Sequence, residues 1–118
     1  MPRGKQMEDQ RMHQTLPGPI AGYFAADNAG GDVAAHFTPE GVVIDEGATH
    51  RGAAEIGAWK QAAQAKYNYR SEVTGVEADG SGYLVTCHVT GDFPGGEVDL
   101  RYRFTLAGGQ IARLEIAP

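Results

Sequence analysis

A short β-branched segment carries the first residue that could do chemistry, Asp45. Residues 42–46 form an apolar and acidic run between two glycines, which predicts a short strand. Strand alternation puts Asp45 on the same side as Val43 and opposite Ile44. If that side is buried, desolvation raises the pKa of Asp45 toward the range of a general base. The opposite parity makes Asp45 an exposed edge-strand residue, and the pattern alone favours neither side.

A tyrosine in the first expected helix is the second candidate. Helical spacing relates Leu16, Ile20, Tyr23, Phe24 and Asp27, and Gly30-Gly31 predicts where this helix stops. The ring of Tyr23 is therefore expected in the core, where its hydroxyl needs a hydrogen-bond partner. That hydroxyl either stabilises an oxyanion in a pocket or donates to a nearby backbone carbonyl, and the helical pattern by itself favours the second role.

Two further helices are expected to position these residues. Asp32 can cap a short second helix that includes His36 and Phe37, and Pro39 ends it. The third helix is expected over residues 53–66, where apolar residues repeat at helical intervals. Trp59 lies on the apolar side of that helix.

From Tyr67 onward the apolar pattern has period two and is interrupted by glycine-rich turns. It predicts an antiparallel meander of four strands, over residues 67–76, 83–92 and 98–106 and around residues 112–116. The residues expected to face inward are Tyr67, Tyr69, Ser71, Val73, Tyr83, Val85, Cys87, Val89, Val98, Leu100, Tyr102, Phe104, Leu106, Ala112, Leu114 and Ile116.

This order predicts an α+β fold, with three N-terminal helices packed on one face of a curved antiparallel β-sheet. A curved sheet that the helices only partly fill leaves a concave space suited to a small apolar molecule. The side chains expected to line such a pocket are Trp59, Tyr67, Tyr69, Val85, Cys87, Leu100, Tyr102 and Phe104.

Composition excludes several other classes of protein. The 118 residues suffice for one domain, expected over residues 16–118, and 42% of them are apolar without a run long enough to span a membrane. The net charge of −5 and the lack of a basic stripe argue against nucleic-acid binding. Residues 1–15 are polar and lack the apolar stretch of a secretory signal, so a disordered or loosely helical tail is expected. A single cysteine fits a cytoplasmic protein.

The four histidines do not have the spacing of metal ligands, so no metal site is expected. His50 lies before the third helix, where it can shape the turn. Cys87 is flanked by apolar inward positions and is expected to be a small core residue.

Three stretches of the sequence resemble a known family: residues 23–32 (YFAADNAGGD), residues 37–45 (FTPEGVVID) and residues 50–52 (HRG). They resemble the nuclear transport factor 2-like superfamily, in its SnoaL-like and ketosteroid-isomerase-like branch, over about residues 16–118. The resemblance implies a cone-shaped α+β fold. It also implies an enzyme, or a binding domain of the same architecture, because this superfamily contains both.

In the ketosteroid isomerases of this superfamily, Tyr23 matches the tyrosine that donates to the oxyanion and Asp45 matches the aspartate that shuttles the proton. Their third residue, a protonated aspartate, falls at Leu100 in this sequence, and Asp99 lies one position away on the opposite face. Through the two residues that match, Tyr23 and Asp45, the resemblance implies proton abstraction next to a carbonyl without a cofactor. It also places His50 near the pocket mouth. The alternative is a non-catalytic domain that binds a hydrophobic ligand or dimerises.

The outward positions of the meander form a row of mixed charge that contains His88, Asp99, Arg101 and Arg103. Such a row is either solvated or self-complementary across a two-fold axis. Because sheets of the resembled family often pack face to face, a homodimer through this outer face is expected.

Overall fold

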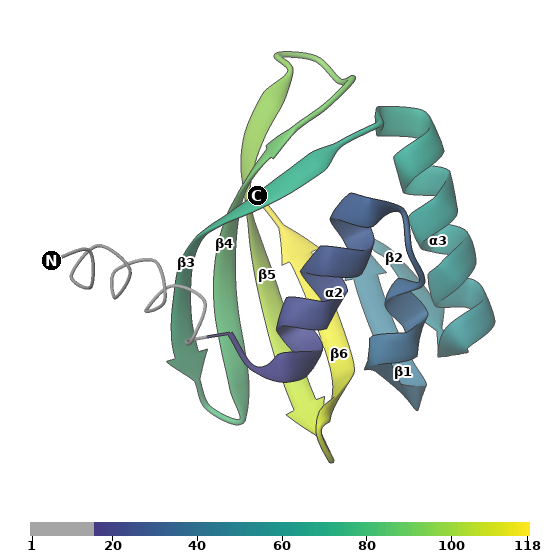
Figure 1. Cartoon of the computed structure of the whole chain (residues 1–118), viewed down its shortest axis with the longest axis vertical. Helices are drawn as coiled ribbons and strands as arrows, with labels where there is room; N and C mark the ends of the chain where they lie inside the picture. Colours follow the sequence, from purple (N-terminus) through teal and green to yellow (C-terminus); the bar gives the residue numbers. More distant parts are fainter. Residues whose placement is uncertain (1–15) are drawn as a thin grey trace, which may run out of the picture.

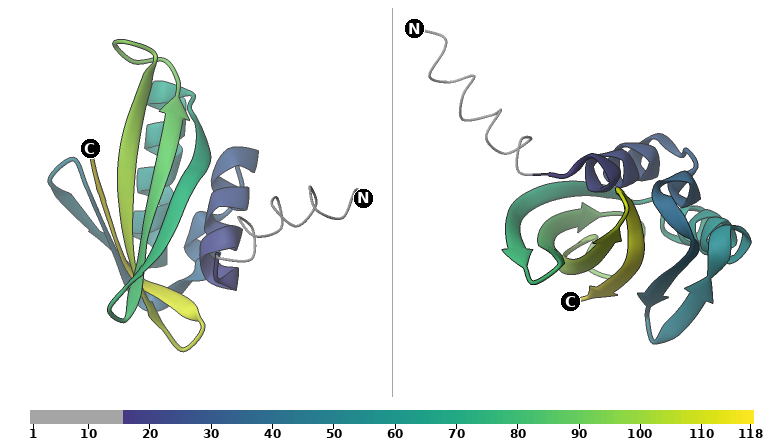
Figure 2. Two further views of the ribbon diagram at one scale, coloured as in Figure 1. Left: turned by 90° about the vertical axis from the view of Figure 1, so that its left-hand side faces the viewer. Right: turned by 90° about the horizontal axis from the view of Figure 1, so that it is seen from below.

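The computed structural model describes residues 16–118, which form two α-helices, one 3₁₀ turn and a six-stranded sheet. The sheet is strongly curved, as Figures 1 and 2 show. Both α-helices pack on its inner face, where their side chains meet those of the strands. The tail expected at residues 1–15 lies outside the described residues.

The first helix, α2 (Gly18–Ala29), confirms the expected helix and its stop signal. Pro17 and Pro19 are tolerated because the first turn of a helix needs no intrahelical N–H donors. Gly30 ends the helix in the left-handed region, with φ 73°. The buried side of α2 carries Ile20, Tyr23, Phe24 and Asp27.

The second expected helix is wrong in kind and extent, and with it the prediction of three helices. Residues Val33–His36 form a single 3₁₀ turn, η1, capped as expected by the side chain of Asp32, which accepts from the Ala34 N–H at 3.1 Å. Phe37 already belongs to the next strand. Four residues are too few for a stable amphipathic helix. Phe37 instead gains its burial as part of the sheet.

The first strand, β1 (Phe37–Asp45), begins five residues before the expected start and runs through Pro39. The proline is accommodated because the pairing of β1 with β6 is irregular between Phe37 and Val42, so no ladder bond is required from it. A tight turn with positive φ at Glu46 and Gly47 leads into β2 (Ala48–Arg51), a strand that the sequence pattern did not indicate.

The helix α3 (Gly52–Tyr67) confirms the helix expected over residues 53–66. It corrects the position of Tyr67, which is the last residue of α3 and not the first residue of a strand. Asn68 ends α3 in the left-handed region, with φ 46°, and this break delays the following strand to Arg70.

The four expected strands of the meander are present as β3 (Arg70–Asp79), β4 (Gly82–Thr90), β5 (Glu97–Ala107) and β6 (Gln110–Ala117). The order across the sheet is β2-β1-β6-β5-β4-β3. β1 pairs with β6 in parallel, which corrects the expectation of a purely antiparallel sheet. The crossover through α3 and the meander is long enough to permit this parallel pairing.

The core lies between the inner face of the sheet and the two helices. It includes Val43, Phe104 and Leu114, which the strand registers place side by side across β1, β6 and β5. Among residues 16–118, no helix is long and apolar enough to cross a membrane.

Close packing at Gly82 yields a prediction for stability. A Cβ at this buried glycine of β4 would overlap the backbone carbonyl oxygen of Phe104 on β5, which cannot move without breaking the ladder. We expect Gly82→Ala to lower the free energy of unfolding by about 3 kcal/mol, measured by urea denaturation.

Gly75→Ala is the matched control for Gly82→Ala. A Cβ at Gly75 of β3 meets only the side chain of Thr86, at 3.8 Å, which is ordinary contact. Its unfolding midpoint should stay close to that of the unmodified protein. Equal losses in the two variants would contradict the steric explanation.

Candidate functional site

The parity of β1 is decided by burial, and it puts Asp45 on the inner face of the sheet. Val43 is fully buried, with 0% exposure, whereas Val42 and Ile44 are partly exposed. Asp45 shares the face of Val43. The strand registers place Asp45 beside Ile116 of β6, which in turn lies beside Tyr102 of β5. The carboxylate therefore lies at the end of an inner-face row that is otherwise apolar and aromatic.

The Asp45 carboxylate is half-buried and is held by an indole. Trp59 of α3 donates its Nε1–H to Asp45 Oδ2 at 3.0 Å. Burial raises the pKa of Asp45 above its ordinary value, and the hydrogen bond from Trp59 only partly opposes this shift. The ring of His50 stacks against Trp59, with 6.0 Å between the ring centroids. Asp45, Trp59 and His50 thus form one group at the edge formed by β1, β2 and α3.

Tyr23 is fully buried, at 0% exposure, and its ring contacts several aromatic rings of the core in edge-on geometry. Its hydroxyl accepts a hydrogen bond from Lys60 Nζ of α3 at 3.1 Å. Burial raises the pKa of the Tyr23 phenol well above its ordinary value, and the nearby Asp27 carboxylate adds to that shift. Tyr23 therefore stays protonated and keeps its O–H proton.

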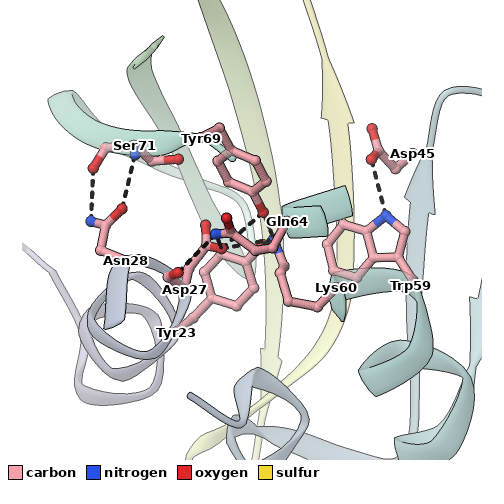
Figure 3. Close-up of polar contacts among 9 residues, drawn as sticks. All are labelled: Tyr23, Asp27, Asn28, Asp45, Trp59, Lys60, Gln64, Tyr69 and Ser71. Carbon is pink, nitrogen blue, oxygen red and sulfur yellow. Dashed lines mark hydrogen bonds and ion pairs between the residues drawn. The ribbon is translucent and has the colours of Figure 1, made fainter. Parts of the chain in front are cut away.

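A buried ion pair is the centre of the polar network in Figure 3. Lys60 Nζ lies 3.1 Å from Asp27 Oδ1, and the two residues are only 6% and 1% exposed. The Tyr69 hydroxyl donates to the same carboxylate oxygen at 2.8 Å and also accepts from Lys60. Gln64 Nε2 donates to Oδ1 at 3.2 Å and to the Asp27 backbone carbonyl at 3.0 Å. We call Tyr23, Asp27, Lys60, Gln64 and Tyr69 the lysine cluster.

The lysine cluster adjoins the Asp45 group through Trp59. Lys60 Nζ lies 4.2 Å from the centroid of the Trp59 ring, within range of a cation–π interaction. Figure 3 shows Trp59 and Lys60 between Asp45 on one side and Tyr23 on the other. Burial lowers the pKa of Lys60, while the Asp27 carboxylate opposes this shift. Two carboxylates, a cation and two phenols are therefore gathered around α3.

Most of the remaining side chains expected to line a pocket are packed against one another. Val85, Cys87, Tyr102 and Phe104 belong to the core, and burial raises the pKa of the Cys87 thiol to about 12. Leu100 is partly buried at the margin of this core.

Tyr67 lies apart from those side chains. Its hydroxyl donates to Glu46 at 3.3 Å, and its ring contacts Phe93.

The structure contains a hollow of about 370 Å³ in a different place, between α2, η1 and α3. Lys60, Asp27 and Gln64 are among its lining residues, so the lysine cluster forms part of its wall. The other lining residues are Gly30, Gly31, Asp32, Val33, Gly57 and Gln61.

Sequence reasoning did not identify Asp27, Lys60 or Gln64 as site residues. One signal was available for Asp27, because a charged residue continues the apolar repeat of Ile20, Tyr23 and Phe24 on α2. A charge on the buried side of a helix requires a partner. The partner, Lys60, is distant in sequence, and no sequence pattern around it indicates that it is buried.

The fold agrees with what comparison with known proteins shows. Residues 20–114 match the family model of the SnoaL-like domain, and the chain belongs to that family. No significant match was found among curated proteins.

Several solved structures have a similar fold. A protein from Sinorhizobium meliloti described as a polyketide cyclase is 41% identical, with a TM-score of 0.83 over 86% of this chain and 95% of that one. A protein from Catenulispora acidiphila with a ketosteroid isomerase-like fold, crystallised with trimethylamine, is 20% identical, with a TM-score of 0.78 over 87% and 86%. A SnoaL-like polyketide cyclase homologue from Jannaschia sp. is 19% identical, with a TM-score of 0.68 over 84% and 81%.

Proposed function

We propose that this protein is an enzyme that removes a proton next to the carbonyl of an apolar cyclic substrate, in a reaction of the isomerase or cyclase type. Asp45 acts as the base and Tyr23 as the oxyanion donor. The observation that carries the proposal is the half-buried Asp45 carboxylate on the inner face, where desolvation raises its pKa. The 41% identity to the Sinorhizobium meliloti protein described as a polyketide cyclase supports the same reaction class.

The hydrogen bonds of the lysine cluster support Tyr23 as the donor. Lys60 donates to the oxygens of both Tyr23 and Tyr69, and the Tyr69 proton is directed to Asp27. Because the Tyr23 oxygen already accepts from Lys60, its own proton is left to donate to a substrate oxygen. When Asp45 takes the substrate proton, the electron pair moves to the carbonyl oxygen, and the Lys60 cation next to Tyr23 favours that negative charge.

The same arrangement suggests the substrate's approach. His50 stacks on Trp59 next to Asp45 and is the proposed pocket mouth. Ile116 is partly buried at the margin of the core, lies beside Asp45 and provides apolar contact near this point. An apolar ring placed here would lie against Trp59 with its reactive carbon near Asp45. This reaction needs no cofactor.

Hydrogen–deuterium exchange at carbon tests the proposal without a known product. We expect the protein to accelerate exchange of the protons next to the carbonyl in some members of a panel of cyclic and polyketide-like ketones in D2O, measured by NMR. Tyr23→Phe should slow that exchange by about 10²-fold, because it removes one oxyanion donor. Tyr83→Phe is the control, since Tyr83 lies on β4 and its hydroxyl is not part of the lysine cluster. Absence of exchange across the panel would contradict the proposed reaction.

One observation favours a non-catalytic alternative, in which the domain only binds a hydrophobic ligand. Tyr23 is fully buried and the expected lining residues Val85, Tyr102 and Phe104 pack against one another. Under this alternative, members of the same ketone panel would raise the melting temperature by binding the native state but would not exchange their protons.

We also propose a homodimer through the outer face of β4 and β5. His88 lies between the carboxylates of Glu97 and Asp99, at 2.9 Å and 2.8 Å, while Arg101 on the same face is exposed. Such alternating charges can pair with a second copy across a two-fold axis. Sedimentation equilibrium should report a dimer, and Arg101→Glu should raise its dissociation constant by about tenfold or more. Lys66→Glu, at an exposed position of α3, should leave the dissociation constant unchanged. A monomer at all concentrations would contradict this interface.

A further inference from the structure

The amine of Lys60 has the surroundings of an activated nucleophile. A carboxylate that can take its proton, Asp27, lies 3.1 Å from Nζ. That carboxylate is held in place by Gln64 and by the Tyr69 hydroxyl. A nucleophile, a base within hydrogen-bond reach and a third group that orients the base form the arrangement by which enzymes activate side chains. The proposed proton abstraction by Asp45 does not use Lys60 as a nucleophile.

A small molecule has a route to this amine. Lys60 and Asp27 line the hollow of about 370 Å³ between α2, η1 and α3. Several of the other lining residues are glycines, and a Cβ built at Gly57 meets no atom within 4 Å. The hollow is therefore open on the side of α3 that carries Lys60, one helical turn from Gly57.

The amine also differs from an ordinary lysine in its charge state. Lys60 is 6% exposed and lies over the rings of Trp59, Tyr69 and Tyr23. Burial lowers its pKa more than Asp27 raises it. Lys66, on the same helix, is exposed, and its contact with Tyr67 raises its pKa. At neutral pH the free-amine fraction is thus larger for Lys60 than for Lys66.

We propose that Lys60 captures aldehydes and ketones as a Schiff base, with Asp27 and the neighbouring phenols moving the protons. Asp27 takes a proton from the ammonium, and the free amine forms a C–N bond to the carbonyl carbon. The C=O electron pair moves to oxygen, which is protonated by a phenol of the cluster. The resulting phenolate takes a proton back from the nitrogen, which frees the nitrogen lone pair. Asp27 then returns its proton to the hydroxyl, which leaves as water while the lone pair forms the C=N bond, so one ammonium and one carbonyl give one iminium and one water.

Reductive trapping of the full-length protein tests this step. The protein is incubated with acetone at neutral pH, treated with sodium borohydride, digested and mapped by peptide mass spectrometry. The chain has three lysines, Lys5, Lys60 and Lys66, and the peptide map distinguishes them from one another. We expect isopropyl-Lys60 to form at least about tenfold faster than isopropyl-Lys66, because the lowered pKa of Lys60 leaves more free amine at neutral pH. Labelling of Lys5 or Lys66 without Lys60 would overturn the proposal.

Three variants complete the experiment. Lys60→Arg keeps the cation but should lose the label, and if it does not fold, the peptide map of the unmodified protein still decides. Gly57→Leu places a side chain in the hollow, at a position of α3 where a Cβ meets no other atom. It should slow labelling of Lys60, and an unchanged rate would exclude this route. Asp45→Asn should not slow trapping at Lys60, because the Asp45 carboxylate only raises the pKa of that amine, and this separates the proposal from the proposed proton abstraction. Loss of trapping in Asp45→Asn would contradict an independent role of Lys60.

Discussion

Replacement of Lys60 by Met is expected to lower the free energy of unfolding by about 3–5 kcal/mol, because it leaves the Asp27 carboxylate buried without its countercharge. Asp27 is 1% exposed, and its Oδ2 atom has no hydrogen-bond partner among the described residues. Tyr69 and Gln64 would still donate to Oδ1 but would not supply a positive charge. Because domains of this size are stable by only about 5–15 kcal/mol, the loss is a large fraction of the total. Urea denaturation followed by circular dichroism measures it.

The double variant Asp27→Asn with Lys60→Met separates charge from packing. Removal of both charges should recover much of the stability that Lys60→Met loses, since no uncompensated ion remains in the core. Lys66→Met on the exposed side of the same helix should change stability by less than about 0.5 kcal/mol. If Lys60→Met and Lys66→Met lose equally little, the ion pair does not hold α2 and α3 together.

Replacement of Asp45 by Asn is expected to reduce proton abstraction by about 10²–10⁴-fold, because an amide cannot accept the substrate proton. The amide is nearly the same size, and its oxygen can still accept the Trp59 indole N–H, so the fold and the unfolding midpoint should change little. The readout is the rate of deuterium exchange into a ketone that the unmodified protein turns over. Unchanged exchange in Asp45→Asn would exclude this residue as the base.

The matched control for Asp45→Asn is Glu46→Gln. Glu46 is the next residue, carries the same charge and is exposed in the turn after β1, so its change tests general electrostatics without touching the inner face. We expect full activity in this variant. A comparable loss in both variants would assign the effect to local charge.

The same base has a pH signature. Proton abstraction needs the ionised carboxylate, so kcat/KM should rise with pH through the pKa of Asp45 in the free protein. Burial raises that pKa, and the midpoint of the rise should therefore lie above the ordinary aspartate value of about 4. A flat profile across acidic pH would contradict a desolvated carboxylate as the base.

The order of secondary structure was largely predictable because local signals define it. The α2 helix ends at the expected glycine, and the three glycine-rich turns separate β3, β4, β5 and β6 as the period-two pattern indicates. Alternation also predicted correctly that Tyr102 and Phe104 face inward while Arg101 and Arg103 face outward. Each of these features depends on residues close together in the sequence, or only on whether a side chain faces the apolar core.

The segment from η1 to β2 was not predictable in the same way. The parallel pairing of β1 with β6 joins residues such as Val43 and Leu114, which no turn connects. β2 has no apolar alternation, and it forms because Glu46 and Gly47 turn the chain back onto β1. The local pattern also predicts a short helix that includes Phe37. In the structure only the η1 turn forms, and Phe37 is buried in the sheet.

The sequence by itself determined the family, the helices α2 and α3 and the four strands of the meander, and it pointed to the two candidate residues Tyr23 and Asp45, because each depends on motifs or on local periodicity. Only the tertiary structure decided that Val43 and Asp45 share the inner face and that Asp27, Lys60 and Tyr69 meet around one ion pair. Periodicity reports which side of an element is apolar, but it does not report which charge from a distant element will be buried against it. The lysine cluster exists because α2, α3 and β3 are packed together, and the cost of burying one charge requires the other.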